Sequence, residues 1–278
     1  MSHYFITGTD TEVGKTYVTS LLLRALNASG RRAVGFKPIA CGDRADAESL
    51  LAASAPDAEL SHVQMDLADL ASVRACTEQV ATQTDVLHLL INNAGIMFTP
   101  EGRTVEGHEL QFGTNHLGHF VLTNRLVPLL LAGAPSRVVC LSSGAHVISD
   151  IIWDDPDFRE RPYDKFDAYG QSKTANLLFA VELDRRLRDR GVRVNAVHPG
   201  MIMTELARHM DMDDMAELGN RAARNAEAGD SAGMPEFKTI PQGAATSVWA
   251  AVAPVLAEVG GTYLADAEIR SAEARDYA

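Results

Sequence analysis

Short apolar runs alternate with longer amphipathic stretches along most of the chain. The short runs are often β-branched, as in strands buried on both faces of a sheet. They predict strands at Tyr4–Thr7, Ala33–Phe36, His62–Asp66, Val86–Asn92, Arg137–Ser142, Arg193–His198 and Gly261–Leu264. The longer stretches have helical spacing, and they predict helices at Lys15–Ser29, Asp46–Ala53, Leu70–Thr82, Leu110–Leu131, Ala168–Arg190 and Gln242–Ala257.

This alternation, with no repeat or low-complexity linker, predicts a single domain over residues 1–278. The fold class is α/β, with a doubly wound, mostly parallel sheet in a Rossmann-like three-layer sandwich. Met201–Lys238 breaks the rhythm and predicts a helical excursion after a strand, where such folds place substrate-binding segments. Its methionines predict apolar packing or the lining of an apolar substrate pocket; they are Met201, Met203, Met210, Met212, Met215 and Met234.

Composition narrows the environment and the partners. A formal net charge of −12 argues against nucleic acid as the main partner, because phosphate binding needs clustered Lys and Arg. Cys41, Cys76 and Cys140 lie far apart, which predicts free thiols in a reducing compartment. The N-terminus does not resemble a signal peptide, and the longest apolar run, Leu126–Ala134, is shorter than the roughly 20 residues that span a bilayer. We therefore expect a cytoplasmic protein with no membrane partner.

The strongest candidate for chemistry is the pair Tyr169 and Lys173 in a predicted helix. Their i, i+4 spacing places phenol and ammonium on one helical face. A phenol titrates near 10, and a neighbouring ammonium lowers its pKa towards the range of a general acid–base. This spacing is common by chance. Taken alone, the two residues could also lie on the exposed surface of a helix without a catalytic role.

Polar residues or glycines follow successive strand ends, where ligands bind in such folds. Ser142 and Ser143 end one predicted strand, and Asn92–Gly95 ends the preceding one. The remaining positions of this kind are Asp66, Asn115, His198, Pro199, Gly200 and Thr204.

The ordered set NNAG, N, SS, YxxxK and HPGxxxT resembles the short-chain dehydrogenase/reductase family from about His62 to Leu264. The segments NNAGIM, NHLGHF, LSSGAH, AYGQSKTAN and HPGM resemble the branch of retinol dehydrogenases and their bacterial relatives. The resemblance implies an NAD(P)-dependent enzyme that interconverts an alcohol and a carbonyl on an apolar small molecule by hydride transfer. It also implies a homodimer or homotetramer formed through the helices Leu110–Leu131 and Ala168–Arg190.

The resemblance assigns catalytic roles to four residues. Tyr169 would exchange a proton with the substrate oxygen, and Lys173 would lower the pKa of Tyr169 and hold the nicotinamide ribose. Ser143 would hydrogen-bond the substrate oxygen, with Ser142 the weaker candidate. Asn115 would anchor a proton-relay water through its backbone.

Further residues would bind the nucleotide. Asp66 would accept a hydrogen bond from the adenine amino group, and Asn92 and Gly95 would line the adenosine side. Pro199, Gly200 and Thr204 would hold the nicotinamide amide. In this part of the chain, the residues expected to contact the nucleotide, besides Tyr169 and Lys173, are Asp66, Asn92, Ala94, Gly95, Pro199, Gly200 and Thr204.

The segment TGTDTEVGKT, residues 7–16, predicts a strand–turn–helix phosphate site. The family turn TGxxxGxG places Thr7, Gly8 and Gly14 at the pyrophosphate, but Glu12 replaces its middle glycine. A carboxylate near phosphate charges costs about 1 kcal/mol in water and more where solvent is excluded. Lys15 is expected to offset part of this repulsion.

Residues 1–57 also resemble the N-terminus of dethiobiotin synthetase, through GTDTEVGKT at 8–16 and GFKPIACG at 35–42. That resemblance implies that Lys15 contacts ATP phosphates, Thr16 ligates magnesium and Lys37 lies near a carbamate. The match then stops, and the expected acidic magnesium ligands and EGAGG-type segment are absent from the sequence. The chain therefore resembles a chimera with a seam near residues 43–61 and a dehydrogenase body at 62–278. P-loop proteins of this class separate the first two strands, whereas a Rossmann sheet pairs them, and we expect them to be paired.

Three hypotheses follow. The first is the NAD(P)-dependent oxidoreductase; the second is an ATP- and Mg-dependent dethiobiotin-synthetase-like ligase. The third is a non-catalytic fold in which Glu12 has abolished cofactor binding. Within the first, Lys37 near the end of the second strand favours NADP, with NAD as the alternative, since a basic residue there accommodates the extra phosphate. A solvent-facing Lys37 is the alternative to that role. No metal site is expected in the dehydrogenase.

Overall fold

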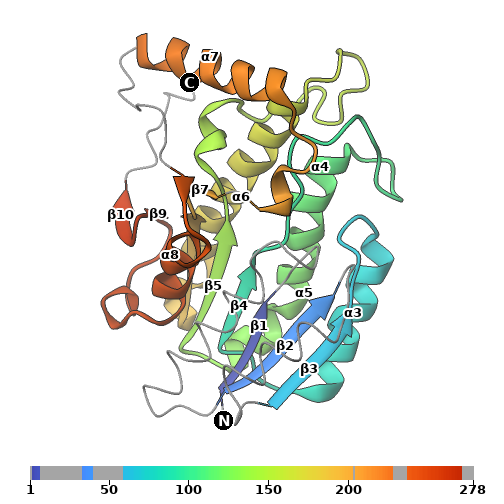
Figure 1. The fold of residues 1–278 in the computed structure, drawn as a ribbon. Coiled ribbons are helices and arrows are strands. Elements are labelled where there is room, and N and C mark those ends of the chain that lie inside the picture. Colours follow the sequence, from blue (N-terminus) through green and yellow to red (C-terminus); the bar gives the residue numbers. More distant parts are fainter. Residues whose placement is uncertain (1, 7–32, 40–58, 203, 228–236, 271–278) are drawn as a thin grey trace.

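A computed structural model describes residues 2–6, 33–39, 59–202, 204–227 and 237–270. Its main sheet has the strand order β10-β9-β6-β5-β4-β1-β2-β3 (Figure 1). The strands are β1 (Ser2–Ile6), β2 (Ala33–Ile39), β3 (Glu59–Gln64), β4 (Leu89–Asn92), β5 (Ser136–Leu141), β6 (Val192–His198), β9 (Tyr263–Ala265) and β10 (Glu268–Arg270). All described pairings in this sheet are parallel except that of β9 with β10.

The first two strands are neighbours, as expected for a Rossmann sheet. β1 pairs in parallel with β2, in the register Ser2 to Ala33, and with β4 on its other side, in the register Tyr4 to Leu89. The chain order therefore reverses beside β1, which is the switch point where α/β sheets bind ligands at the carboxyl ends of their strands. The predicted fold class is confirmed.

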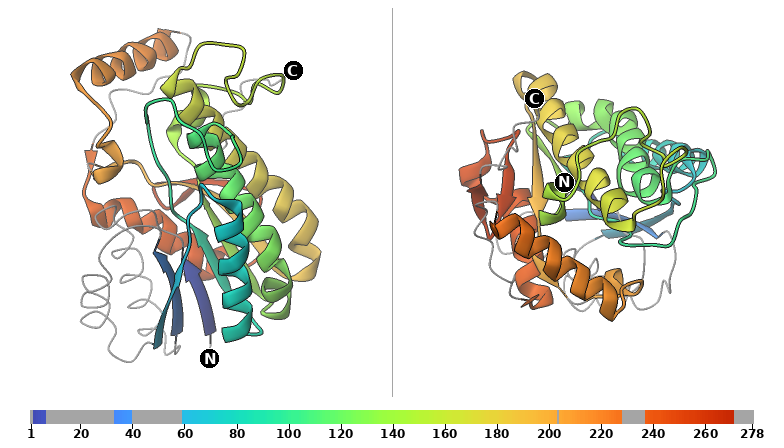
Figure 2. Two further views of the ribbon diagram at one scale, coloured as in Figure 1. Left: turned by 90° about the vertical axis from the view of Figure 1, so that its right-hand side faces the viewer. Right: turned by 90° about the horizontal axis from the view of Figure 1, so that it is seen from above.

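Helices cover both faces of the sheet (Figure 2). α3 (Leu70–Gln83), α5 (Gly118–Ala132) and α6 (Lys165–Leu187) lie together on one face, and α8 (Ile240–Val252) lies on the other. Along β4, Leu90 packs into the core beneath the first group, whereas Leu89 and Ile91 pack into the core beneath α8. β4 thus buries both faces, which explains its continuous apolar run in the sequence.

The predicted helix Leu110–Leu131 divides into α4 (Leu110–Phe112), a π-helical turn η1 (Gly113–Leu117) and α5. Glu109 starts it by accepting hydrogen bonds from the backbone N–H groups of Gln111 and Phe112. The π-helical turn contains Asn115, whose backbone is expected to anchor a water. Asn115 therefore lies where the regular α-helical hydrogen bonds are interrupted.

The excursion after β6 does contain a helix, α7 (Met212–Glu227), which lies across the carboxyl edge of the sheet (Figure 1). It is preceded by β7 (Met201–Ile202) and followed by β8 (Phe237–Lys238), which pair with each other as a separate two-stranded sheet. The remaining helical turns are η2 (Gly144–Val147), η3 (Arg188–Arg190), η4 (Glu205–Ala207) and η5 (Pro254–Leu256).

Several predicted boundaries were wrong by a few residues. β3 ends at Gln64, so Asp66 lies beyond the strand, and β4 begins at Leu89 rather than Val86. β9 begins at Tyr263, because Gly261 has a φ of +68° and forms a turn. The predicted helices Lys15–Ser29 and Asp46–Ala53 lie outside the described residues. Among the described helices, none combines the length and apolar character needed to cross a bilayer.

Candidate active site

Tyr169 and Lys173 lie on α6 with their side chains in the interior, being 4% and 5% exposed. The Lys173 Nζ atom is 5.4 Å from the centre of the Tyr169 ring, so the expected common face is confirmed. The helix that carries them starts at Asp164, whose carboxylate accepts hydrogen bonds from the backbone N–H groups of Phe166 and Asp167. Burial of both side chains argues against the surface-pair alternative.

Burial dominates the titration of this pair. It raises the pKa of Tyr169 to about 12, and a hydrogen bond with Ser143 acts in the opposite direction. Burial also lowers the pKa of Lys173 to about 8. The Tyr169 pKa is thus raised rather than lowered as expected, because desolvation dominates. At neutral pH the phenol is protonated and can donate its proton.

Asn115 fixes the segment that follows β4. Its Oδ1 accepts a hydrogen bond from the Ile96 N–H (2.8 Å), and its Nδ2 donates to the Ile96 carbonyl (2.9 Å) and to Ser172 Oγ (3.0 Å). A Cβ atom on Gly95 would lie 3.2 Å from Asn115 Oδ1 and 3.6 Å from Lys173 Nζ. The Gly95 backbone therefore lies directly against two predicted catalytic side chains, and a side chain there would crowd them.

The two serines after β5 have different surroundings. Ser142 is 3% exposed, and its hydroxyl donates to the Lys173 carbonyl (2.8 Å). Ser143 contacts the Tyr169 phenol, and its Oγ accepts a hydrogen bond from the Ala145 N–H (3.1 Å) at the start of η2. Ser142 thus ties β5 to α6, and Ser143 is the serine placed beside the acid–base candidate.

His198 joins the serine loop to the HPG turn. Its Nδ1 accepts hydrogen bonds from the backbone N–H groups of Gly144 (3.1 Å) and Gly200 (3.4 Å). Because Nδ1 is an acceptor, the neutral ring carries its proton on Nε2. Burial lowers the pKa of His198 to about 4, so the ring stays neutral at physiological pH. The sequence placed His198 at a strand end but did not indicate this link.

A second polar connection supports the HPG turn. Gly200 has a φ of +91°, and a Cβ atom on it would lie 2.6 Å from Lys238 Cδ. The Lys238 ammonium forms an ion pair with Asp266 in the turn between β9 and β10. Thr204 Oγ1 accepts from the Leu206 N–H (3.3 Å) and starts the helical turn η4. Neither Lys238 nor Asp266 is marked by a sequence motif.

The remaining residues expected to bind the cofactor differ in their exposure. Asp66 is exposed near the carboxyl end of β3, where one oxygen accepts from the Ala68 N–H (2.8 Å). The Asn92 side chain instead points into the protein and donates to Thr123 Oγ1 (2.8 Å), and Ala94 is 2% exposed. Any contact of Asn92 or Ala94 with a nucleotide therefore falls to its backbone. Outside the described residues, or outside the described side chains, lie Thr7, Gly8, Glu12, Gly14, Lys15, Thr16 and Lys37.

The described part of the site fits a nicotinamide nucleotide. Gly95 brings its backbone close to Asn115 and Lys173 at the carboxyl edge, next to the switch point where such folds bind nucleotides. Lys173 Nζ donates to the Leu141 carbonyl (3.2 Å), and an ammonium has two further protons to donate.

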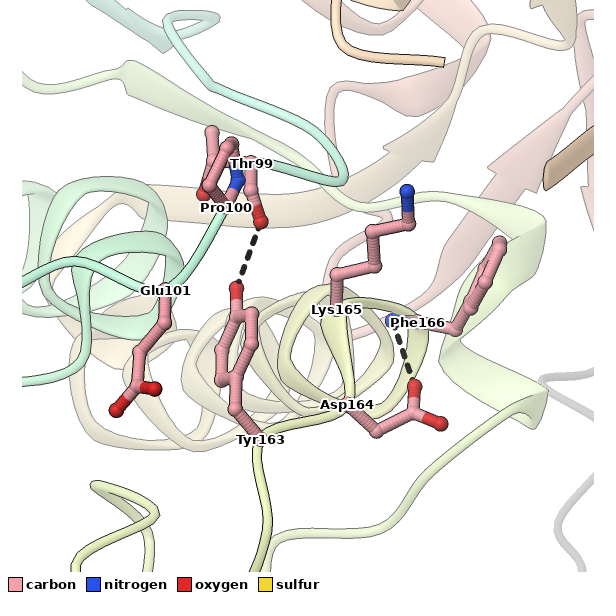
Figure 3. A pocket seen from close by; sticks show the side chains of 7 residues that line it. All are labelled: Thr99, Pro100, Glu101, Tyr163, Asp164, Lys165 and Phe166. Carbon is pink, nitrogen blue, oxygen red and sulfur yellow. Dashed lines mark hydrogen bonds between the residues drawn. The ribbon is translucent and has the colours of Figure 1, made fainter. Parts of the chain in front are cut away.

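Apolar residues extend from Tyr169 towards α7. The Phe98 ring lies 5.1 Å from the Tyr169 ring and 4.6 Å from the Phe166 ring, and Met210 and Leu218 pack against this cluster. Phe166 also lines an open cavity of about 330 Å³ with Thr99, Pro100, Glu101, Tyr163, Asp164 and Lys165 (Figure 3). Figure 3 shows Tyr163 reaching across this cavity to the Thr99 carbonyl, with a hydrogen bond of 3.0 Å.

Ion pairs hold α7 against the start of α6. Lys165 contacts Asp214 at 2.5 Å, and Arg221 contacts both Asp164 (2.8 Å) and Asp167 (3.1 Å). The Arg221 guanidinium also lies 4.8 Å from the centre of the Phe166 ring. The excursion is therefore attached to the helix that carries Tyr169, beside the apolar cluster.

The chain matches known proteins across most of its length. The family profile described as short chain dehydrogenase matches residues 5–214. Retinol dehydrogenase 12 of Mus musculus is 39% identical over 264 residues, which are 94% of this chain and 76% of that protein. A probable oxidoreductase of Streptomyces lividans is 39% identical over 258 residues, which are 91% of this chain and 83% of that protein. A crystal structure of a short chain dehydrogenase from Burkholderia cenocepacia in complex with NADP has a TM-score of 0.66 at 21% identity, covers 95% of both chains and shows the shared fold.

These matches also bear on the expected chimera of a dethiobiotin-synthetase-like segment and a dehydrogenase body. The dehydrogenase match begins at residue 5 and so includes most of residues 1–57, and the mouse relative aligns with 94% of the chain. Nothing in these matches supports a dethiobiotin-synthetase origin for that segment or the ligase alternative. Profile, relatives and fold agree instead on one assignment, and the chain belongs to the short-chain dehydrogenase family.

Proposed function

We propose that this NAD(P)-dependent oxidoreductase interconverts a retinol-type apolar alcohol and its carbonyl, with NADP as the preferred nucleotide. The observation that carries the proposal is the buried Tyr169, which contacts Ser143 and has Lys173 on the same helical face. A nicotinamide nucleotide, when bound, supplies or accepts the hydride. The protein's own residues then have to bind the substrate oxygen and move one proton.

In the reducing direction, Ser143 and Tyr169 both direct hydroxyl groups at the substrate carbonyl oxygen. The neutral phenol donates its proton to that oxygen as the carbonyl becomes an alcohol, and the Lys173 ammonium stabilises the phenolate that remains. In the oxidising direction the phenolate removes the alcohol proton. Ser143 holds the oxygen in both directions, and His198 holds the loop that carries Ser143 through the Gly144 N–H.

An apolar substrate is supported by the cluster beside the phenol. Phe98, Phe166, Met210 and Leu218 provide an apolar surface that adjoins Tyr169 and leads towards the cavity at Thr99–Glu101. Retinol dehydrogenases are among the relatives of the chain, which supports a long apolar alcohol. The methionine in this cluster, Met210, can adapt its shape to such a ligand.

NADP and an oligomer remain parts of the proposal. Lys37 near the end of β2, and a fold neighbour crystallised with NADP, support NADP over NAD. Exposed apolar side chains on α5 and α6, among them Phe120, Leu178 and Val181, support a homodimer or homotetramer through these helices. Sedimentation would test the oligomer, and a monomer at assay concentration would contradict it.

The test of the function is Tyr169→Phe, assayed by reduction of NADP with an apolar primary alcohol. Loss of the phenol removes the proton acceptor but keeps the aromatic ring. We expect turnover to fall by at least about 10²-fold, the lower range for loss of a general acid–base. Nucleotide binding, followed by fluorescence, should change little. Turnover by Tyr169→Phe near the wild-type rate would remove Tyr169 from the mechanism.

A further inference from the structure

Asn176 lies on α6 three residues after Lys173 and is 5% exposed. Its Nδ2 donates to the backbone carbonyls of Asn115 (3.1 Å) and Leu141 (3.0 Å). We propose that Asn176 is a positioning residue: it fixes these two carbonyls and thereby sets the place of the Lys173 ammonium. The catalytic part of this inference rests on the proposed function, whereas the placement of Lys173 can be measured independently of turnover.

The orientation of the Asn176 amide is determined by its partners. Both Nδ2 protons are directed to carbonyl oxygens, so Oδ1 is the acceptor, and it lies 3.1 Å from His116 Nδ1. His116 must therefore carry its proton on Nδ1. Burial lowers the pKa of His116 to about 4, so the ring is neutral at physiological pH and this pairing persists. Three hydrogen bonds thus hold the amide in one position.

The Leu141 carbonyl connects Asn176 to Lys173. This oxygen, at the end of β5, accepts from Asn176 Nδ2 at 3.0 Å and from Lys173 Nζ at 3.2 Å. A carbonyl oxygen has two lone pairs, so Asn176 leaves Lys173 only one of them. The amide also brings the positive end of its dipole close to the ammonium. Asn176 thereby limits how strongly Leu141 attracts Lys173 away from Tyr169.

The Asn115 carbonyl is the second anchor. It accepts from Asn176 Nδ2 and from His119 Nδ1 (2.9 Å), which engages both of its lone pairs. A relay water at this carbonyl, as the family resemblance implies, would have to share one of them. His119 is buried, and burial lowers its pKa to about 4, so its ring is neutral. Asn176 therefore joins the π-helical turn, β5 and α6 around Lys173.

Replacing Asn176 by leucine keeps the side-chain size and removes all three hydrogen bonds. The second lone pair of Leu141 then becomes available to Lys173, and the positive end of the amide dipole is lost. Both changes favour the ammonium, so the pKa of Lys173 should rise above its value of about 8. Lys173 is drawn towards Leu141, and we expect kcat to fall about tenfold, as for a modest misalignment of a catalytic group.

Asn195→Leu is the matched control. Asn195 is 3% exposed, and its side chain bonds the Val259 carbonyl (3.1 Å) and Thr262 Oγ1 (2.8 Å), between β6 and the start of β9. Both variants remove a buried amide with several hydrogen bonds and should lower Tm by similar amounts. Only Asn176→Leu should change kcat and the pKa of Lys173. If Asn176→Leu does not accumulate, Asn176→Ala serves the same test.

The pKa of Lys173 can be followed by NMR of isotope-labelled lysine, because the chain has five lysines, and Lys173→Arg assigns the signal. A higher Lys173 pKa in Asn176→Leu, unchanged in Asn195→Leu, with a selective loss of kcat supports the proposal. An unchanged Lys173 pKa overturns it. If wild type turns over no alcohol while the Lys173 pKa still rises in Asn176→Leu, the placement holds and the proposed function fails.

Discussion

Replacing Lys173 by methionine tests how much the ammonium stabilises the Tyr169 phenolate. The charge lies 5.4 Å from the centre of the phenol ring. Coulomb's law with an effective dielectric constant of about 20 gives roughly 3 kcal/mol at that separation, or roughly two pH units. Methionine keeps the length and apolar stem of the side chain, so we expect Tyr169 to become harder to ionise by this amount.

The assay is the pH dependence of kcat/KM for alcohol oxidation in wild type and Lys173→Met. The variant should lose roughly 10²-fold at neutral pH, where the ammonium is present, and its difference from wild type should narrow above pH about 8. Lys173→Arg keeps a positive charge and should lose much less. In wild type the ammonium is present below pH about 8 and is lost above it, because burial lowers the pKa of Lys173 to that value.

Stability separates this effect from misfolding. The pKa of Lys173 is lowered from 10.5 to about 8, so the unfolded chain binds more protons between these values. Wild-type stability should therefore rise as the pH rises through this window, and Lys173→Met should lack that rise. At neutral pH the variant avoids a buried charge and should be at least as stable as wild type. A Lys173→Met variant with the wild-type kcat/KM at neutral pH would refute the reasoning.

Other predictions concern the packing that supports the site. Asp184→Ala leaves Arg193, which is 15% exposed, without the carboxylate that it contacts at 3.0 Å; we expect a loss of roughly 3–5 kcal/mol by chemical denaturation, and an unchanged midpoint would contradict this. Gly118→Ala places a Cβ 2.6 Å from the Leu67 carbonyl and should cost roughly 1–3 kcal/mol, whereas a wild-type Tm would show that α5 can shift freely. Gly95→Val should raise the Kd for NADP in a fluorescence titration and also lower Tm, because its side chain crowds Asn115 and Lys173; an equal Kd would place the nucleotide elsewhere.

Much of the fold could be predicted because most strands are short and apolar and the long helices have an apolar face. The sequence missed the β9–β10 hairpin because its turn residues, Asp266 and Ala267, adopt positive φ values without a glycine to mark them. It missed the pair β7 and β8 because strands of two residues have no periodicity to detect. The π-helical turn around Asn115 also leaves no signal in an apolar pattern.

The candidate site was predictable where residues follow a motif. The i, i+4 spacing placed Tyr169 with Lys173, and the strand end placed Ser143 beside them. Asn176 was not singled out, and the role of His198 was missed, since both roles depend on backbone groups that only the fold brings within reach. The pKa of Tyr169 was expected to be lowered, but burial, which spacing does not reveal, raises it.

The central claim is that hydride moves between the substrate and a nicotinamide nucleotide while Tyr169 moves the proton. The most direct measurement uses an apolar alcohol deuterated at its carbinol carbon, followed by mass spectrometry of the reduced nucleotide. We predict that deuterium appears in NADPH formed by wild type and that Tyr169→Phe forms almost none. Reduced nucleotide without deuterium, or the same yield from Tyr169→Phe, would contradict the account.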